Sequence, residues 1–101
     1  MTTNVAGDSS PLMSTWKQSA TLLAALQEDL ERATARCITI TRHTNDAHQA
    51  ATTAGSATAI GDAEDIQTAV AVLGQHLTRA LTTASITADT IRTVIHDDPD
   101  N

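Results

Sequence analysis

The sequence predicts an all-α protein in which two long helices fold back on each other as an antiparallel hairpin. Three observations support this fold class. Apolar residues recur with a seven-residue period over two long stretches, a glycine-containing segment separates the stretches, and no proline interrupts either one. At 101 residues, the chain is long enough for one such domain.

The first helix is expected over residues 11–54, after a small, polar and disordered tail at 1–9. Ser10 can cap the helix, and Pro11 suits its first position because proline lacks an N–H that would be unpaired there. One set of positions, here called a, then recurs every seven residues, and a second set, called d, lies three residues later. The a positions are Trp16, Leu23, Leu30, Cys37, Thr44 and Ala51, and the d positions are Ser19, Leu26, Ala33, Ile40, Ala47 and Ala54.

A β-branched run at 37–41 weakens this helix, because Ile and Thr lose side-chain freedom in helices. A short strand is the alternative there. The seven-residue period passes through the run in register, which favours helix.

We expect a turn at 55–61, since Gly55 suits the end of a helix. Asp62 then caps a second helix over 62–96, with Glu64 and Asp65 in its first turn. An acidic tail follows at 98–101. The a positions of this helix are Ala63, Val70, Leu77, Ala84 and Ile91, and its d positions are Ile66, Leu73, Ala80, Thr87 and Val94. In both helices, the a and d positions together are expected to form the seam of the hairpin.

The composition points to a partner. Trp16 is the single aromatic residue and alanine supplies much of the apolar content, so the core of one hairpin is thin. A lone cysteine cannot form an internal disulfide, and no zinc-ligand spacing occurs, which leaves oligomerisation as the expected source of stability. The net charge of −6 argues against nucleic acid, and no stretch is long and apolar enough to cross a membrane.

Apolar residues off the seam gather at the open end of the hairpin, where the first helix begins and the second ends. A second copy or another helical chain is expected to cover them, giving a homodimer or heterodimer with four-helix packing. Terminal segments folding back over them are the alternative. Trp16 is the strongest contact candidate, because tryptophan is enriched at interfaces. The predicted interface residues are Leu12, Met13, Trp16, Leu22, Leu81, Ala88 and Ile95.

No motif points to catalysis. His43, Asp46, His48 and His76 are the nearest approach to a metal site, but no Glu precedes a histidine by three residues as a di-iron bundle requires. Cys37 lies on the seam without an activating neighbour, and we expect it to act as a small apolar residue. We therefore expect a non-enzymatic protein with no catalytic residue, metal or cofactor.

The plan of residues 10–97 resembles the small Trp-Xaa-Gly helical-hairpin proteins of type VII secretion systems. Those are acidic chains of similar length that pair into four-helix dimers and are exported without a cleaved signal peptide. Their Trp-Xaa-Gly turn is absent here, where the turn reads GSATAIGD, and so is the tyrosine of their export signal. The segment ITADTIRTVIHDD keeps an acidic, helical character. The Ala- and Thr-rich, Lys-poor composition is similar to that of actinobacterial proteins.

Two functions follow as expectations. The first is a helical interaction protein, similar to a type VII substrate or accessory protein and acting through dimerisation. The second is a small acidic regulator, such as an antitoxin or a conjugation or phage accessory protein, that masks a partner's surface. The N-terminal residues resemble no signal peptide, so we expect a cytoplasmic location, with export without a cleaved signal as the alternative.

Overall fold

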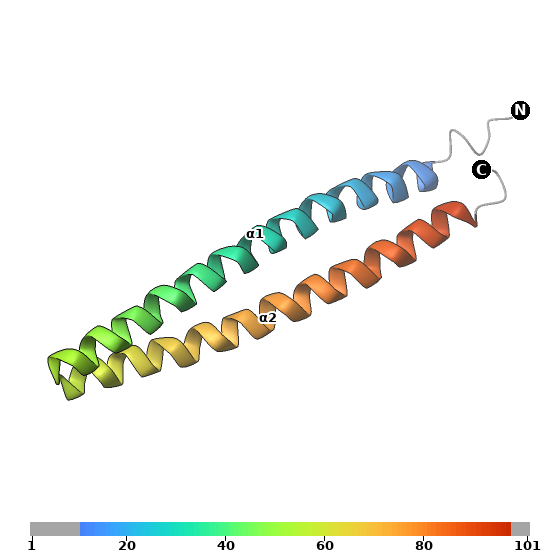
Figure 1. The fold of residues 1–101 in the computed structure, drawn as a ribbon. Helices are drawn as coiled ribbons and strands as arrows, with labels where there is room; N and C mark the ends of the chain where they lie inside the picture. The colour runs from blue at the N-terminus through green and yellow to red at the C-terminus, as the bar shows by residue number, and fades with distance from the viewer. Residues whose placement is uncertain (1–10, 98–101) are drawn as a thin grey trace, which may run out of the picture. The chain divides into compact units, whose positions relative to one another are not determined.

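The computed structural model describes residues 11–97, and all of these except Gly55, Ser56 and Asp97 are helical. Helix α1 spans Pro11–Ala54 and helix α2 spans Ala57–His96, so the predicted all-α helical hairpin is confirmed (Figure 1). The predicted tails at 1–9 and 98–101 and the cap at Ser10 lie outside the described residues.

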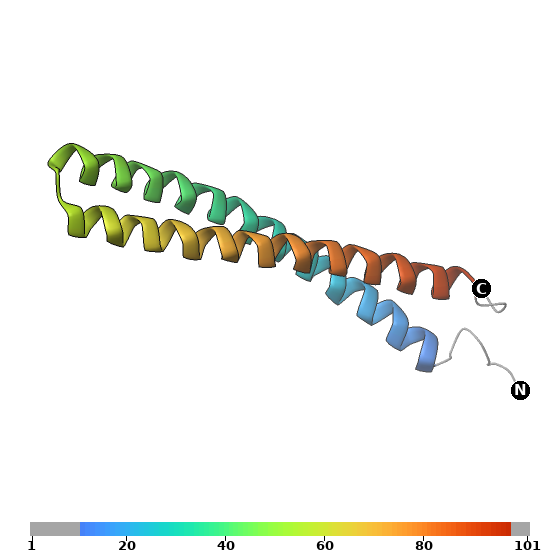
Figure 2. The ribbon, with the colours of Figure 1, turned by 90° about the horizontal axis from the view of Figure 1, so that it is seen from below.

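The chain divides into two compact units, which are described separately. The turn unit is Leu30–Ala80, and the terminal unit combines Met1–Asp29 with Leu81–Asn101, of which residues 11–29 and 81–97 are described. In both ribbon views the two helical segments of the turn unit, coloured green to orange, run side by side in opposite directions from one short link (Figures 1 and 2).

Two residues, Gly55 and Ser56, connect the helices. Gly55 has a φ of 69°, which places it in the left-handed region that favours glycine. The N–H of Gly55 donates to the carbonyl of Thr52 at 3.1 Å, and that of Ser56 donates to Ala51 at 3.2 Å. These two hydrogen bonds form a Schellman motif, which satisfies carbonyls that the end of α1 leaves free.

The predicted turn at 55–61 was therefore too long, and Asp62 is not the cap of α2. Ser56 is the cap, because its Oγ accepts a hydrogen bond from the N–H of Ala59 at 3.2 Å. Its carbonyl accepts the first helical hydrogen bond, from Ile60 at 2.9 Å. Gly61 is inside α2, and the first turn of α2 contains no acidic residue, so Glu64 lies farther along than predicted.

The β-branched run at 37–41 is helical, as the period predicted. Its threonine hydroxyls donate to carbonyls four residues earlier, from Thr39 to Ala35 at 3.3 Å and from Thr41 to Cys37 at 2.9 Å. Threonines elsewhere in both helices do the same, for example Thr53 and Thr93. These local bonds give each hydroxyl a partner inside the helix, so a threonine-rich sequence is compatible with this fold.

The predicted seam was half right. All a positions are buried or half-buried in both units, and the buried side chains include Cys37, Ala51, Ala63, Val70, Ala84 and Ile91. The d positions Leu26, Ile40, Ile66, Leu73 and Val94 are instead exposed. The second row of the seam lies four residues after each a position, at positions we call e.

The e positions include half-buried Gln27, His48, Gln67, Gly74 and Leu81. An a/e seam differs from an a/d seam by a rotation of each helix of about 50°, which is half of the turn between successive residues. The hairpin therefore packs on a mixture of small and polar side chains, and it leaves most of its d positions exposed, including all the large ones.

Candidate interaction surface

One flank of the a/e seam is closed by polar side chains. In the terminal unit, Gln27 donates a hydrogen bond from Nε2 to the Oγ of Ser85 at 3.2 Å. In the turn unit, Gln67 donates from Nε2 to the Oδ1 of Asn45 at 2.8 Å. Each bond joins an e position on one helix to a position one residue after an a position, called b, on the other.

A third bridge of this kind links His48 and Glu64 in the turn unit, whose Nε2 and Oε2 atoms lie 3.3 Å apart. The bonds of all three pairs are exposed to solvent, so each stabilises the hairpin only weakly. They nevertheless show that e and b side chains of both helices share one flank, and that hydrogen bonds between the helices cover it.

The opposite flank contains the d positions. Around each helix, the d row adjoins the a row on the side away from the e row. Since the e and b positions of both helices share one flank, the d positions of both helices share the other. We call the large, exposed apolar d positions of each unit its d stripe. The d stripe of the terminal unit is Leu26, Val94 and Leu12, which lies seven residues before Ser19, and that of the turn unit is Ile40, Ile66 and Leu73.

The terminal unit has a groove of about 330 Å³ beside its d stripe. Ser19 and Leu26 of α1 and Thr87 of α2 all line this groove, which places d positions of both helices on one face. Leu22 adjoins them and is 71% exposed. The remaining lining residues are the a positions Leu23 and Ile91. The groove is therefore apolar and opens onto the seam itself.

The residues predicted as an interface fall into two groups, all within the terminal unit. Leu12 and Leu22 are exposed on the d flank. Met13 is only 5% exposed, and Trp16 is half-buried at its a position. Leu81, Ala88 and Ile95 are e positions of α2, and all three are half-buried. The d stripe of the turn unit lay outside that prediction, because its members had been assigned to the seam.

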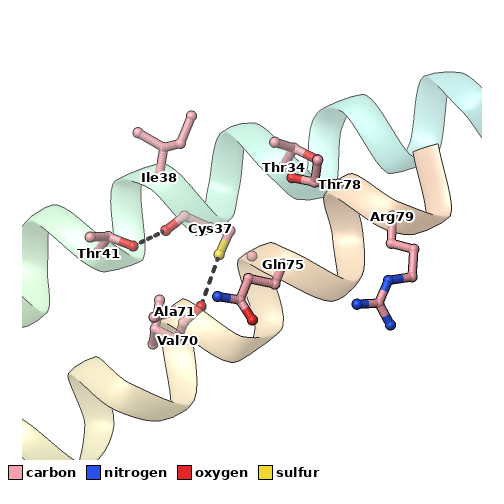
Figure 3. A pocket seen from close by; sticks show the side chains of 10 residues that line it. Thr34, Cys37, Ile38, Thr41, Val70, Ala71, Gln75, Thr78 and Arg79 are labelled. Carbon is pink, nitrogen blue, oxygen red and sulfur yellow. Dashed lines mark hydrogen bonds between the residues drawn. The ribbon is translucent and has the colours of Figure 1, made fainter. Parts of the chain in front are cut away.

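A larger pocket of about 650 Å³ lies on the b and e side of the turn unit (Figure 3). Cys37 points toward α2, where its Sγ lies 3.7 Å from the carbonyl oxygen of Val70 as a weak donor, whereas Ile38 points away from α2. The lining contains no His, Asp or Glu, so no group that could act as a general base lines the pocket beside Cys37. The pocket reflects the small side chains of Ala71 and Gly74.

The histidines do not form a metal site in the described part of the chain. Between residues 11 and 97, no three His, Cys, Asp or Glu side chains lie close enough together to hold a metal ion. His48 pairs with Glu64, and His43 and His76 are exposed. Neither described helix has an apolar stretch long enough to span a membrane.

Comparison of the chain with models of known families, with curated proteins and with solved structures gave no match. The evidence for the candidate site therefore comes from its geometry. That geometry is an apolar d stripe on one flank of each unit, opposite a flank that hydrogen bonds close.

Proposed function

We propose that this chain is a non-enzymatic interaction protein, and that its function is to pair through its d stripe with another helical chain to form a four-helix bundle. The observation that supports this most is the exposure of Leu26, Ile40 and Leu73 at regular d positions beside a seam that is already complete without them. Helices of a bundle bury such a wide stripe, because each one contacts two neighbours.

The apolar area is large enough to matter. Ile40, Ile66 and Leu73 are each about half exposed, and burying the rest of each would stabilise an assembly by roughly 1 kcal/mol per residue. The buried core consists mainly of alanine, cysteine and valine, which contribute less area per residue. Assembly would therefore add a substantial fraction of the total stability.

The biological role we propose is that of a protein similar to a type VII secretion substrate or accessory protein. The resemblance in chain length, acidity and two-helix plan supports this role. Pairing through an apolar face is also how such hairpins would hide leucine side chains from water before export.

A small acidic regulator that masks a basic surface is the second candidate. The acidic side chains Glu31 and Asp46 support it, since both are exposed. However, the exposed basic residues Arg32 and Arg42 lie close to them in α1, which mixes the charges on that surface. We therefore rank pairing through the d stripe first.

Side-chain footprinting with hydroxyl radicals tests the proposed surface. Leu73 and Val72 are neighbours on α2 with almost equal exposure, 47% and 45%, but only Leu73 is a d position. In concentrated protein, Leu73 should be protected from oxidation while Val72 remains reactive, and dilution should restore Leu73. Equal reactivity of the two residues at every concentration would contradict pairing of this chain through the stripe.

A further inference from the structure

The hydrogen bonds that cover the b and e flank of the turn unit stop before its middle. Near the turn, Asn45 on α1 accepts a hydrogen bond from Gln67 on α2 at 2.8 Å. Three residues later on α1, His48 lies 3.3 Å from Glu64, which is three residues earlier on α2. Each step along α1 therefore corresponds to an equal step back along α2, and this register gives the residues that face each other farther from the turn.

Farther from the turn, the same register places Thr41 opposite Ala71 and Ile38 opposite Gly74. Neither pair can form a hydrogen-bonded bridge, because the side chains of alanine and isoleucine carry no polar atom and glycine has no side chain. The pocket of about 650 Å³ lies at this gap, and all four residues line it. A Cβ at Gly74 would meet only the Sγ of Cys37, at 3.6 Å, so no other side chain fills the space beside the glycine.

We infer that this pocket binds a small organic anion with an apolar body, specifically an aliphatic carboxylate. A volume of about 650 Å³ is in the range of sites that hold small molecules. The pocket lies on the flank opposite the d stripe, so binding there goes beyond the function proposed above and does not require pairing with another chain.

The inner part of the pocket suits the apolar body. Cys37 and Val70 are buried there, with 6% and 8% exposure, and Ile38 is exposed at the edge. The thiol of Cys37 already donates to the carbonyl oxygen of Val70 at 3.7 Å, so it offers a ligand no strong donor. The α1 part of the lining runs from Thr34 to Thr41, which is roughly 10 Å of helix and matches a short hydrocarbon chain better than a bare ion.

The free hydrogen-bond donors of the pocket lie on its α2 edge (Figure 3). Thr78 and Arg79 follow Gln75 by three and four residues, so these side chains lie on one side of α2. Within residues 11–97, none of the three has a hydrogen bond or an ion pair to another side chain. On the α1 edge, by contrast, Thr34 and Thr41 donate their hydroxyl hydrogens to carbonyls of their own helix at 2.8 and 2.9 Å. An anionic head group would therefore find its donors on α2.

The charge of the lining is opposite to that of the whole chain. The chain has a net charge of −6, but among the described residues Arg79 is the only charged one that lines the pocket. A carboxylate would gain a counter-charge there, whereas a cationic ligand would be repelled by Arg79 and would meet no acidic group in the lining. A guanidinium can also donate two parallel hydrogen bonds to one carboxylate, which favours this head group.

A titration with octanoate, below the concentration at which it forms micelles, tests the head group. Backbone amide shifts in ¹H–¹⁵N NMR spectra report both the affinity and the place of binding, and octanol serves as the uncharged counterpart. Arg79→Gln should weaken octanoate binding roughly fivefold, because an ion pair at an exposed edge is modest, and should leave octanol binding unchanged. Arg42→Gln is the matched control, since Arg42 is exposed in the same unit but does not line the pocket, and it should bind octanoate as the wild type does.

A second pair of variants tests the place of binding. Ala71→Leu fills the pocket and should abolish the octanoate shifts at Gly74 and Thr78, whereas Ala24→Leu changes an exposed b position outside the pocket and should keep them. Circular dichroism checks the helicity of each variant, and if Ala71→Leu loses it, the comparison of Arg79→Gln with Arg42→Gln decides.

Three results would overturn the inference. Octanoate shifts centred on Ser19 and Leu26 would place the ligand in the groove beside the d stripe instead. Equal loss of affinity in Arg79→Gln and Arg42→Gln, or no loss in either, would remove the anionic head group from the site. A helical wild-type protein whose spectrum does not change with octanoate would contradict a carboxylate site altogether.

Discussion

The three glycines of the helices and their link should respond differently to replacement by alanine. Gly55 has a φ of 69°, and an L-residue in that region costs roughly 1–2 kcal/mol. Alanine also restricts the unfolded chain more than glycine does, and this offsets the cost by roughly 0.4–1 kcal/mol. Gly55→Ala should therefore reduce the free energy of unfolding by about 1 kcal/mol.

Gly74→Ala should change the free energy of unfolding in the opposite direction. A Cβ at Gly74 would lie 3.6 Å from the Sγ of Cys37, which is an ordinary van der Waals contact. Alanine is favoured over glycine inside a helix by about 1 kcal/mol, so this variant should be more stable by that amount. Gly61→Ala is the control, because a Cβ at Gly61 meets nothing within 4 Å.

Thermal unfolding followed by circular dichroism at one fixed protein concentration measures all three effects. For a domain of this size, 1 kcal/mol corresponds to roughly 4–8 °C in Tm. Gly55→Ala should melt lower than the wild type, and Gly61→Ala and Gly74→Ala should melt higher by similar amounts. A loss of stability in Gly74→Ala with a gain in Gly61→Ala would refute the reasoning, since the helices would then need a glycine opposite Cys37.

Three further predictions concern single features of the fold. Ser56→Ala removes the cap of α2 and should lower the stability by about 1 kcal/mol in chemical denaturation, and recovery with Ser56→Asp would identify the cap as the cause. Thr39→Ala should raise the stability by a few tenths of a kcal/mol, roughly the helix-propensity difference, because its exposed hydroxyl makes only a local bond; a clear loss would show that the hydroxyl matters. The coupling of Asn45 with Gln67 in a double-mutant cycle should be at most about 1 kcal/mol, since the hydrogen bond between them is exposed to solvent, and a larger value would mean that the pair is buried in an assembly.

The sequence was sufficient for the fold class and for one row of the seam. The a positions contain the most regular apolar period, and those from Trp16 to Ala51 are buried or half-buried in both units. The start of α1 at Pro11 and the end of α2 at His96 also agree with the local signals. These features depend on periodicity and on helix-end chemistry, which act over a few residues.

The second row was wrong for a physical reason. Both d and e positions lie next to a positions on a helix, so either row can complete a seam. The d row is more apolar, and the sequence therefore favoured it. The hairpin uses the e row, where polar partners such as Gln67 and Asn45 match across the helices, a pairing that appears only once the register between the helices is known.

The link was misjudged in a similar way. Gly61 and Asp62 form a plausible helix start, but Ser56 offers a cap five residues earlier, directly after the glycine that ends α1. The intervening residues Ala57 and Ile60 accept helical geometry. Sequence reasoning found the correct end of α1 and then chose the later of two possible caps.

The concentration dependence of thermal melting tests the central claim most directly. If burial of the d stripe between chains stabilises the fold, the Tm of the wild-type protein should rise steadily over a hundredfold increase in concentration, because dimerisation shifts the unfolding equilibrium by mass action. The Tm of Leu73→Glu should stay constant, and that of Ala71→Glu should follow the wild type. A fully helical wild-type protein with one concentration-independent Tm would contradict the account.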